Sequence, residues 1–186
     1  MERLHQEDLA QALGLASGSK YAEPEPSTAG RVAGLLRRSS SNSLADLRAF
    51  ARLCLYNYLV GNCDNHLKNF SLMHQGPWIR LAPAYDLVPT AIFERFSKSM
   101  GMAIGEHRVI DQVEPGDFTL LAEGMGLTEG ALKRIARDLV GRIVPAVMAA
   151  GDLNTPAGDS LSFDAEDLVD DMAPRLKVLS AFALGR

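Results

Sequence analysis

The sequence predicts a mainly helical α+β fold with one small β-hairpin and no large sheet. Apolar side chains recur every three or four residues over three long stretches, which is the period of an amphipathic helix. These stretches are 44–60, 128–150 and 162–182. The hairpin is indicated at residues 70–82, where two short β-type runs flank the turn Gln75-Gly76-Pro77.

The longest predicted helix runs from Leu44 to about Val60, with Ser43 as the expected N-cap. Its apolar stripe is wide, which predicts a helix that is buried on most sides. Upstream, His5 to Leu13 also shows helical spacing, and a shorter helix is expected around Val32 to Leu36. We therefore expect helices, separated by polar loops, throughout the N-terminal third of the chain.

A short strand is expected at Met100 to Ile104. Gly101 and Gly105 in or beside this strand indicate close backbone approach or turns. Pro115 is a suitable first-turn residue for the next helix, which should end at Gly126.

Two longer helices should complete the chain. Thr128 and Ser162 are suitable N-caps for them. Pro145 and Pro174 fall inside these helices and should bend them, because proline removes a backbone donor. The Met and Leu stripes of both segments indicate core packing and not a cofactor site.

Composition and charge are those of one ordinary globular domain: 186 residues, 47% hydrophobic and 23% charged. The net charge of −4 argues against direct binding of nucleic acid. Two cysteines, Cys54 and Cys63, indicate a reducing compartment and not a disulfide scaffold. The longest apolar run, Ile143 to Ala150, is too short to span a membrane, and the N-terminus lacks a signal core. We expect a cytoplasmic protein without a membrane partner.

Polar and ionisable residues crowd into two segments on either side of the predicted hairpin, Gly61 to Asn69 and Pro83 to Asp86. Asp64 and Asn69 are five positions apart, as are the Asp and Asn of the protein-kinase loop H-R-D-x-x-x-x-N. Asp86 follows the hairpin, where a protein kinase has a second magnesium-binding Asp. The predicted order is base, amide, hairpin, carboxylate.

This order of residue types suits phosphoryl transfer, which needs positioning and charge neutralisation more than covalent chemistry. Mg²⁺ binds oxygen ligands, often only one or two protein carboxylates, and Asp86 and Asn69 can supply such oxygens. Asp64 can accept the proton of an attacking hydroxyl, and Lys68 can meet a phosphate as a point charge. Each Asp or Asn alone is also a common turn former. The ordered set favours a site, so we expect Asp64, Asn69 and Asp86 to converge on one cleft.

Two segments of the sequence resemble the catalytic and metal loops of HipA-like serine/threonine kinases, which are bacterial toxins of type II toxin–antitoxin systems. These segments are Asp64 to Ser71 and Leu81 to Leu87. Arg3 to Leu9, Gln11 to Gly14 and Lys20-Tyr21 also resemble the segment that enters the C-terminal lobe of that family. The resemblance implies one kinase C-lobe-like helical domain over residues 1–186.

The resemblance also implies roles for individual residues. Asp64 would be the catalytic base, and Asn69 and Asp86 would hold Mg²⁺. The residues implied to bind the nucleotide cofactor ATP are His66, Lys68, Asn69, Tyr85 and Asp86. The implied reaction is phosphoryl transfer from Mg-ATP to a serine or threonine hydroxyl of a protein substrate.

The sequence lacks a glycine-rich phosphate-covering loop and a strand lysine of the V-A-I-K type. We therefore expect a C-terminal lobe from which the N-terminal ATP-clamping lobe is absent. Such a lobe should be nearly inactive alone. Its partners would be the protein substrate and an antitoxin or N-terminal lobe, without direct nucleic-acid binding. The alternative is a non-catalytic module, derived from the same lobe, that binds an antitoxin or another partner.

Overall fold

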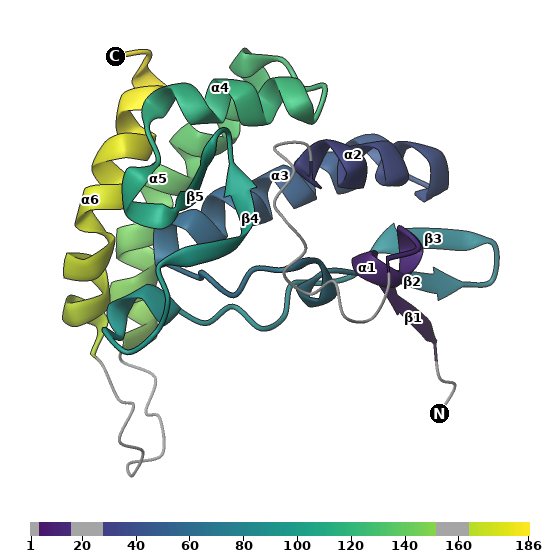
Figure 1. Ribbon diagram of the computed structural model, residues 1–186, viewed down its shortest axis with the longest axis horizontal. Coiled ribbons are helices and arrows are strands. Elements are labelled where there is room, and N and C mark those ends of the chain that lie inside the picture. The colour runs from purple at the N-terminus through teal and green to yellow at the C-terminus, as the bar shows by residue number, and fades with distance from the viewer. Residues whose placement is uncertain (1–3, 16–27, 152–163) are drawn as a thin grey trace, which may run out of the picture.

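A computed structural model describes residues 4–15, 28–151 and 164–186 of the chain. In these residues the fold contains six α-helices and two small antiparallel sheets (Figure 1). The helices are α1 (Leu9–Ala12), α2 (Thr28–Ser39), α3 (Ser43–Val60), α4 (Pro115–Gly124), α5 (Glu129–Gly151) and α6 (Ala165–Leu184). The strands are β1 (His5–Asp8), β2 (Ser71–Gln75), β3 (Trp78–Leu81), β4 (Ser99–Ile104) and β5 (His107–Val109). The expected mainly helical α+β class is confirmed. Lys20, Tyr21 and Ser162 lie outside the described residues.

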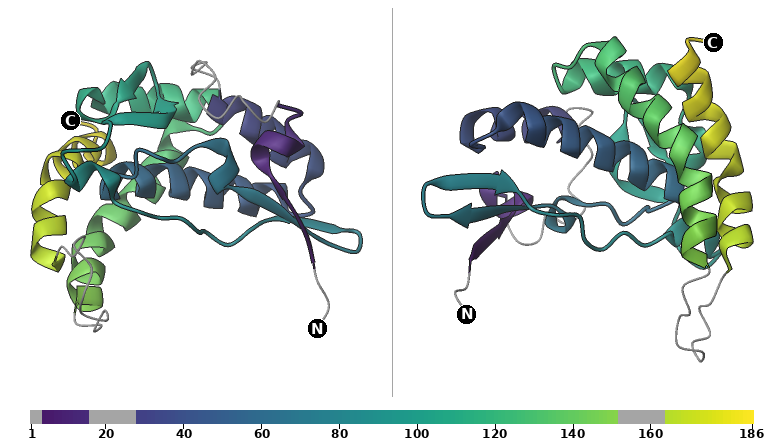
Figure 2. Two further views of the ribbon diagram at one scale, coloured as in Figure 1. Left: turned by 60° about the horizontal axis from the view of Figure 1, so that its bottom comes forward. Right: turned by 180° about the vertical axis from the view of Figure 1, so that it is seen from behind.

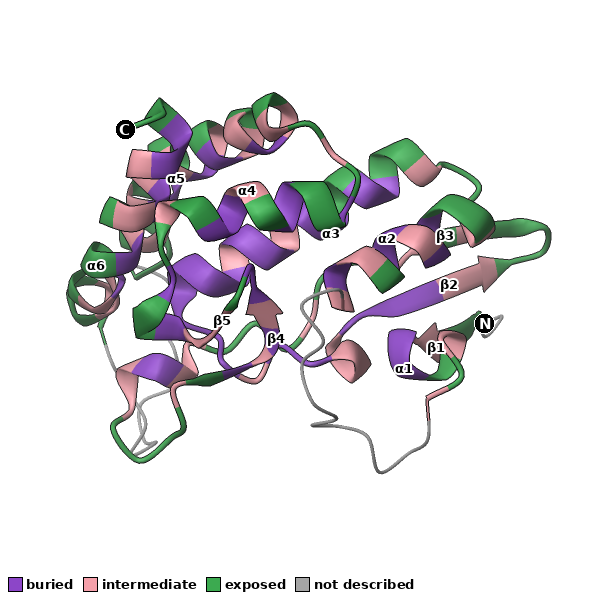
Figure 3. Cartoon of the chain, turned by 45° about the horizontal axis from the view of Figure 1, so that its top comes forward, coloured by how far each residue is buried: buried purple, intermediate pink, exposed green. Residues whose placement is uncertain are grey.

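Helix α3 is the centre of the fold, and α2, α5 and α6 all pack against it. Tyr58 of α3 meets Phe118 of α4 edge-on at 5.3 Å, and Phe118 meets Phe182 of α6 at 5.2 Å, both between ring centroids. Buried residues gather where these helices face one another (Figure 3). The prediction that α3 is buried on most sides is therefore confirmed.

The two ends of the molecule differ in character (Figure 1 and Figure 2). The three-stranded sheet β1-β2-β3 lies at one end, and the paired helices α5 and α6 lie at the other. No described helix combines the length and the apolar character that a membrane span requires.

Asn42, and not Ser43, caps the N-terminus of α3. The Asn42 Oδ1 accepts a hydrogen bond from the Ala45 backbone N at 3.3 Å, and Ser43 is the first helical residue. The predicted cap was wrong by one position, because Asn and Ser are equally good N-caps. A second hydrogen bond favours Asn42 as the cap. The Asn42 backbone N donates to Ser40 Oγ at 3.0 Å, and this bond fixes the turn before the helix.

The segment His5 to Leu13 was predicted to be one helix, and this was wrong. His5–Asp8 forms strand β1, which pairs antiparallel with β2 so that Gln6 faces Met73. Asp8 then caps the short helix α1 by accepting a hydrogen bond from Gln11 N at 2.8 Å. The hydrogen-bonding edge that β2 offers is distant in sequence, so helical periodicity in a short window could not reveal it.

The predicted hairpin and the predicted strand near residue 100 are both present as β2–β3 and β4. The partner of β4, strand β5, was not predicted. Asp117 of α4 holds this second hairpin in place by accepting hydrogen bonds from Glu106 N at 2.9 Å and His107 Nδ1 at 2.8 Å. Gly105 turns between the strands with a φ of 56°, as its position in the sequence indicated.

The predicted N-cap of α5 is confirmed, since Thr128 Oγ1 accepts a hydrogen bond from Ala131 N at 3.2 Å. The predicted N-cap of α6, Ser162, was wrong: Asp164 caps this helix and accepts a hydrogen bond from Asp167 N at 2.8 Å. Pro145 and Pro174 lie inside α5 and α6, and both helices continue past them.

An ion pair between the buried carboxylate of Asp46 and the exposed guanidinium of Arg80 fixes the first hairpin to α3. Asp46 of α3 accepts three hydrogen bonds from Arg80 of β3, one from Nη2 at 2.9 Å and two from Nε at 3.0 and 3.1 Å. Ser40 Oγ and the Leu81 backbone N donate to the same carboxylate at 2.6 and 2.9 Å. Burial alone would raise the pKa of Asp46, but the hydrogen bonds from Arg80, Ser40 and Leu81 lower it below its ordinary value.

We expect Asp46→Asn to lower the free energy of unfolding by about 1–3 kcal/mol at neutral pH, because charge-assisted hydrogen bonds are lost. A carboxylate whose folded pKa is depressed stabilises the protein above its unfolded pKa of about 3.9. That contribution is lost as the pH falls through the folded pKa. Urea unfolding between pH 7 and pH 3 should therefore show a shallower loss of stability in the variant. Identical pH profiles for both proteins would contradict this account of Asp46.

Candidate functional site

The C-terminal end of α3 aims the segment that carries Asp64. Gly61 ends the helix in the left-handed conformation, with a φ of 76°. A Cβ at this position would lie 2.7 Å from Ala91 Cβ and 2.9 Å from Arg175 Nη2. Backbone conformation and space therefore both require glycine here. The buried helix α3 therefore fixes the direction in which the backbone enters the loop 62–66.

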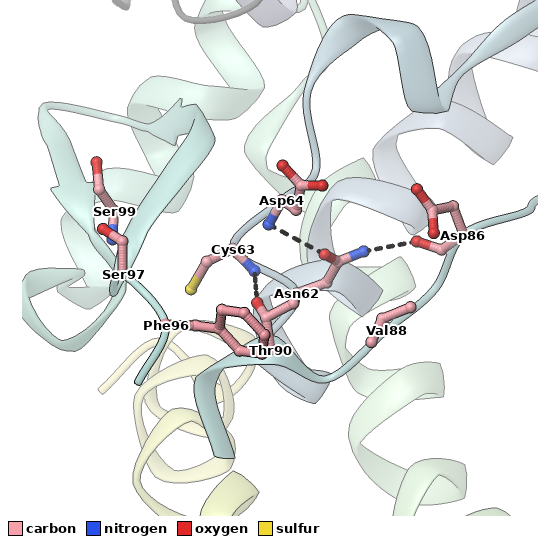
Figure 4. A pocket seen from close by; sticks show the side chains of 9 residues that line it. All are labelled: Asn62, Cys63, Asp64, Asp86, Val88, Thr90, Phe96, Ser97 and Ser99. Carbon is pink, nitrogen blue, oxygen red and sulfur yellow. Dashed lines mark hydrogen bonds between the residues drawn. The ribbon is translucent and has the colours of Figure 1, made fainter. Parts of the chain in front are cut away.

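Asn62 joins the two predicted loops. Its side chain is buried, and its Nδ2 donates to Asn57 Oδ1 at 3.1 Å and to the Asp86 carbonyl oxygen at 3.0 Å. Its Oδ1 accepts a hydrogen bond from the Asp64 backbone N at 3.1 Å. Figure 4 shows this amide between the backbones of Asp64 and Asp86. The sequence analysis assigned no role to Asn62. The feature that could have indicated one is its position, since it is an amide residue between a buried helix and the candidate base.

A pocket of about 440 Å³ opens beside this amide (Figure 4). Carboxylates, hydroxyls and apolar groups share its walls. It is lined by Asn62, Cys63, Asp64, Asp86, Val88, Thr90, Phe96, Ser97 and Ser99. The structure therefore brings the candidate base and the candidate metal ligand Asp86 into one pocket, while the other predicted site residues lie outside its lining.

Asp86 has an unusual backbone conformation. Its φ is 55°, and it is the one non-glycine residue with positive φ among those that the structure describes. This conformation costs free energy for a residue with a Cβ, and such outliers cluster at functional sites. The hydrogen bond from Asn62 to the Asp86 carbonyl oxygen helps to hold it. The strained turn keeps the exposed Asp86 side chain at the pocket.

Asn69 braces the loop from its other end. It closes the short 3₁₀ turn Leu67–Asn69, and its Nδ2 donates to the Asp64 carbonyl oxygen at 2.8 Å. Because Nδ2 already makes this hydrogen bond, Oδ1 is the Asn69 side-chain atom that could bind a metal ion. Asn69 is not in the lining of the pocket, so its direct contact is with the Asp64 backbone.

His66 lies under the candidate base. It is buried, and its Nε2 lies 3.7 Å from Asp64 Oδ1. Strand β4 passes close by: a Cβ on Gly101 would lie 2.7 Å from the His66 backbone N. The close backbone approach that Gly101 indicated in the sequence is thus confirmed, and Gly101 N donates to Cys63 O at 2.8 Å across it.

A chain of hydrogen bonds runs from the Lys68 carbonyl oxygen through the Tyr85 hydroxyl and Ser71 Oγ to Gln6. The Tyr85 hydroxyl donates to the Lys68 carbonyl oxygen at 2.8 Å and lies 2.6 Å from Ser71 Oγ. Gln6 Nε2 of β1 donates to that same Ser71 oxygen at 3.0 Å. The Tyr85 hydroxyl thus ties the Asp86 turn to the sheet, and the half-buried ring is the part left to face a ligand.

Cys63 lines the pocket but is not an activated nucleophile. Burial raises the pKa of its thiol, so the unreactive protonated form dominates near neutral pH. Its backbone N donates to Thr90 Oγ1 at 2.8 Å, and the same hydroxyl donates to Gly61 O at 3.2 Å. Thr90 therefore anchors the segment after Asp86 to the start of the candidate loop.

Helix α6 supports the C-terminal end of α3, which leads into the loop. Arg175 is buried, and its Nε donates to the Leu59 carbonyl oxygen at 3.0 Å. Its Nη2 pairs with Asp171 one helical turn away, which balances the buried charge. This contact satisfies a carbonyl at the C-terminal end of α3, where a cation is also favoured by the helix dipole.

The arrangement has a counterpart among known proteins, since the family model for the HipA-like C-terminal domain matches residues 1–147. The chain belongs to this family. It is 32% identical over 147 residues to the protein Y4mE of Sinorhizobium fredii, with 79% of this chain and 35% of that protein covered. It is 29% identical over 178 residues to the serine/threonine-protein kinase toxin HipA of Shewanella oneidensis, with 88% and 40% covered.

The fold is also similar to a solved structure, a Shewanella oneidensis complex of HipA, HipB and their operator DNA. One chain of that complex superposes on this HipA-like domain with a TM-score of 0.74 at 25% identity. The match covers 98% of this chain and 44% of that one. The chain therefore spans less than half the length of these relatives. The resemblance read from the two loops and the expected fold class are both confirmed.

The pocket offers carboxylate oxygens, which are donors of the type that Mg²⁺ takes. Among the described residues, no group of three or more His, Cys, Asp or Glu side chains is placed to hold a metal ion. Asp64 and Asp86 nevertheless offer two carboxylates to one pocket. One or two carboxylates, with phosphate oxygens and water, is the usual set for Mg²⁺.

We expect Asn62→Ala to loosen both loops at once. The variant leaves the Asp64 N–H and the Asp86 carbonyl without their shared partner, which should cost about 1–3 kcal/mol of unfolding free energy. Amide hydrogen exchange should accelerate at Asp64 and around Asp86. The matched control is Gln75→Ala, which removes an exposed amide from the hairpin turn. Unchanged exchange at Asp64 in Asn62→Ala would show that the amide does not hold the loop.

Proposed function

We propose that this chain is the C-terminal catalytic lobe of a serine/threonine protein kinase, which transfers the γ-phosphoryl group of Mg-ATP to a protein hydroxyl. The observation that supports the proposal most directly is that Asp64 and Asp86 line one pocket. The Asn62 side chain hydrogen-bonds to the backbones of both residues. Membership of the HipA-like C-terminal domain family and similarity to a serine/threonine-protein kinase toxin support the proposed reaction.

Each site residue has a role in this proposal. The Asp64 side chain is 45% exposed, so a substrate hydroxyl can reach its carboxylate and give up a proton to it. Asp86 and the Asn69 Oδ1 would hold Mg²⁺, which neutralises charge on the phosphate oxygens when it is bound. His66, Lys68 and Tyr85 would form the nucleotide side of the site around the chain of hydrogen bonds at Ser71.

In this proposal, residues 1–186 form a single lobe of the kinase. The relatives are more than twice as long as the segments that match, so the groups that cover and clamp the nucleotide would come from the remaining part of such a protein. Positioning of reactants can supply about 7–11 kcal/mol of the barrier reduction. The lobe alone would therefore be a very slow catalyst.

A second candidate function is binding of a partner protein without catalysis. The solved relative belongs to a complex that contains HipB and operator DNA. This chain also exposes two large apolar side chains at the sheet end of the molecule, Trp78 at 63% and Leu44 at 55%. The turn before α3 is joined to β3 by two hydrogen bonds, from Ser41 N to the Ile79 carbonyl oxygen at 2.8 Å and from Ile79 N to Ser41 Oγ at 2.9 Å. An antitoxin or an N-terminal lobe would find an apolar contact there.

The decisive test of catalysis is phosphate transfer with an N-terminal lobe of the family supplied. We expect measurable transfer to a protein substrate, lowered roughly 10²–10⁴-fold by Asp64→Ala, because the general base is lost. Asp138→Asn on α5 is the matched control, since it alters an exposed carboxylate away from the pocket. Equal rates for Asp64→Ala and the unaltered chain would refute the role of the base.

Metal-dependent nucleotide binding tests Asp86 separately from catalysis. We expect Asp86→Asn to weaken Mg-ATP binding roughly tenfold, equivalent to about 1.4 kcal/mol, because one of very few carboxylate ligands is lost. Binding of ATP without metal should be affected less. Titration calorimetry with and without Mg²⁺ would measure both, with Asp111→Asn as the control carboxylate. A loss of affinity that is the same with and without metal would argue against a metal ligand.

A further inference from the structure

The pocket continues beyond the two carboxylates toward an apolar wall. Val88 and Phe96, which line it, are each 44% exposed (Figure 4). Leu87, beside Val88, is 36% exposed. Two adjoining serines, Ser97 and Ser99, also line the pocket and add hydroxyl groups. The proposed chemistry at Asp64 does not use this wall.

The Phe96 ring contacts a second aromatic ring although much of it is exposed. It meets the Phe93 ring edge-on, with 5.9 Å between the centroids and an interplanar angle of 87°. Its backbone N donates to Phe93 O at 3.0 Å, which closes a tight turn. An aromatic side chain that is fixed before binding loses little conformational entropy when a partner covers it. Phe96 is therefore suited to be an anchor for an apolar group.

A cation already lies against the Phe96 ring. The Arg95 guanidinium carbon lies 4.9 Å from the centroid of the Phe96 ring and already occupies a cation position there. Lys98 follows in the chain, with its Nζ 3.5 Å from Asp111 Oδ2. An uncharged apolar side chain would meet no repulsion from Arg95, whereas a cation would meet that repulsion together with attraction from Asp64 and Asp86, which line the same pocket.

We propose that Phe96, with Val88, binds a bulky apolar side chain that neighbours the acceptor serine or threonine of the protein substrate. The inference rests on the proposed function, because Asp64 marks where the acceptor hydroxyl must lie. Phe96 and Asp64 line the same pocket, so an extended segment with its hydroxyl at Asp64 passes over the apolar wall. The volume of about 440 Å³ lies in the range of ligand-binding clefts. The substrate class is thus a protein segment with Leu, Ile, Met or Phe next to the acceptor.

Peptide binding tests this specificity without requiring catalysis. Fluorescently labelled peptides with one serine would carry Leu, Ala, Lys or Glu at the adjacent positions, and fluorescence anisotropy would report their binding to the chain. We expect the Leu peptide to bind roughly tenfold more tightly than the Ala peptide, as burial of one aliphatic side chain allows. Phe96→Ala should abolish most of this preference, and Val88→Ala should reduce it. Leu120→Ala on α4 is the matched control, because it removes another apolar side chain of similar exposure, 43%, outside the pocket lining and should leave the preference intact.

Several outcomes would overturn the inference. They are the absence of binding by the Leu peptide, equal binding of the Leu and Ala peptides, tightest binding of the Lys or Glu peptide, and an unchanged preference in Phe96→Ala. Circular dichroism would verify that each variant is folded. The phosphate-transfer test at Asp64 is a separate measurement. Transfer without peptide preference would refute this inference alone, and peptide preference without transfer would refute the proposed catalysis.

Discussion

The buried amide of Asn62 is the interaction on which the site depends. One side chain donates to the Asp86 carbonyl and accepts from the Asp64 N–H, so the two carboxylates share a single support. A buried amide must satisfy its hydrogen bonds, and leaving them unmade is costly. Its own position is fixed by Asn57 on the buried helix α3. The geometry of the pocket is therefore a consequence of packing in the core.

The loop between Gly61 and Asn69 is supported on several sides by segments that are distant in sequence. Thr90 reaches it from the segment after Asp86 and Gly101 from β4, while Arg175 of α6 holds the preceding end of α3 through the Leu59 carbonyl oxygen. Functional groups must be held within fractions of an ångström, and supporting contacts of this kind supply that accuracy. The family model ends at residue 147, so the contact from Arg175 comes from a part of the chain beyond the matched segment.

The pocket has two chemically different sides. Asp64 and Asp86 supply charge, and Asp86 does so from a backbone conformation that L-residues rarely adopt. Val88 and Phe96 supply apolar surface that nothing in the described chain covers fully. Under the proposed function, the carboxylates would hold the charged phosphate donor, and the apolar side would face a neighbour of the acceptor hydroxyl.

The sequence by itself determined the helices with strong periodicity, the hairpin at β2–β3 and the order of the groups around Asp64 and Asp86, because these depend on spacing and turn chemistry along the chain. It did not determine that His5–Asp8 is a strand, since that depends on pairing with β2. Nor did it assign Asn62 and Arg175, whose hydrogen-bonding partners are chosen only when α3, α6 and the Asp86 turn come together. Local periodicity carries no information about such distant contacts, so the tertiary structure alone decided which polar side chains hold the two loops in register.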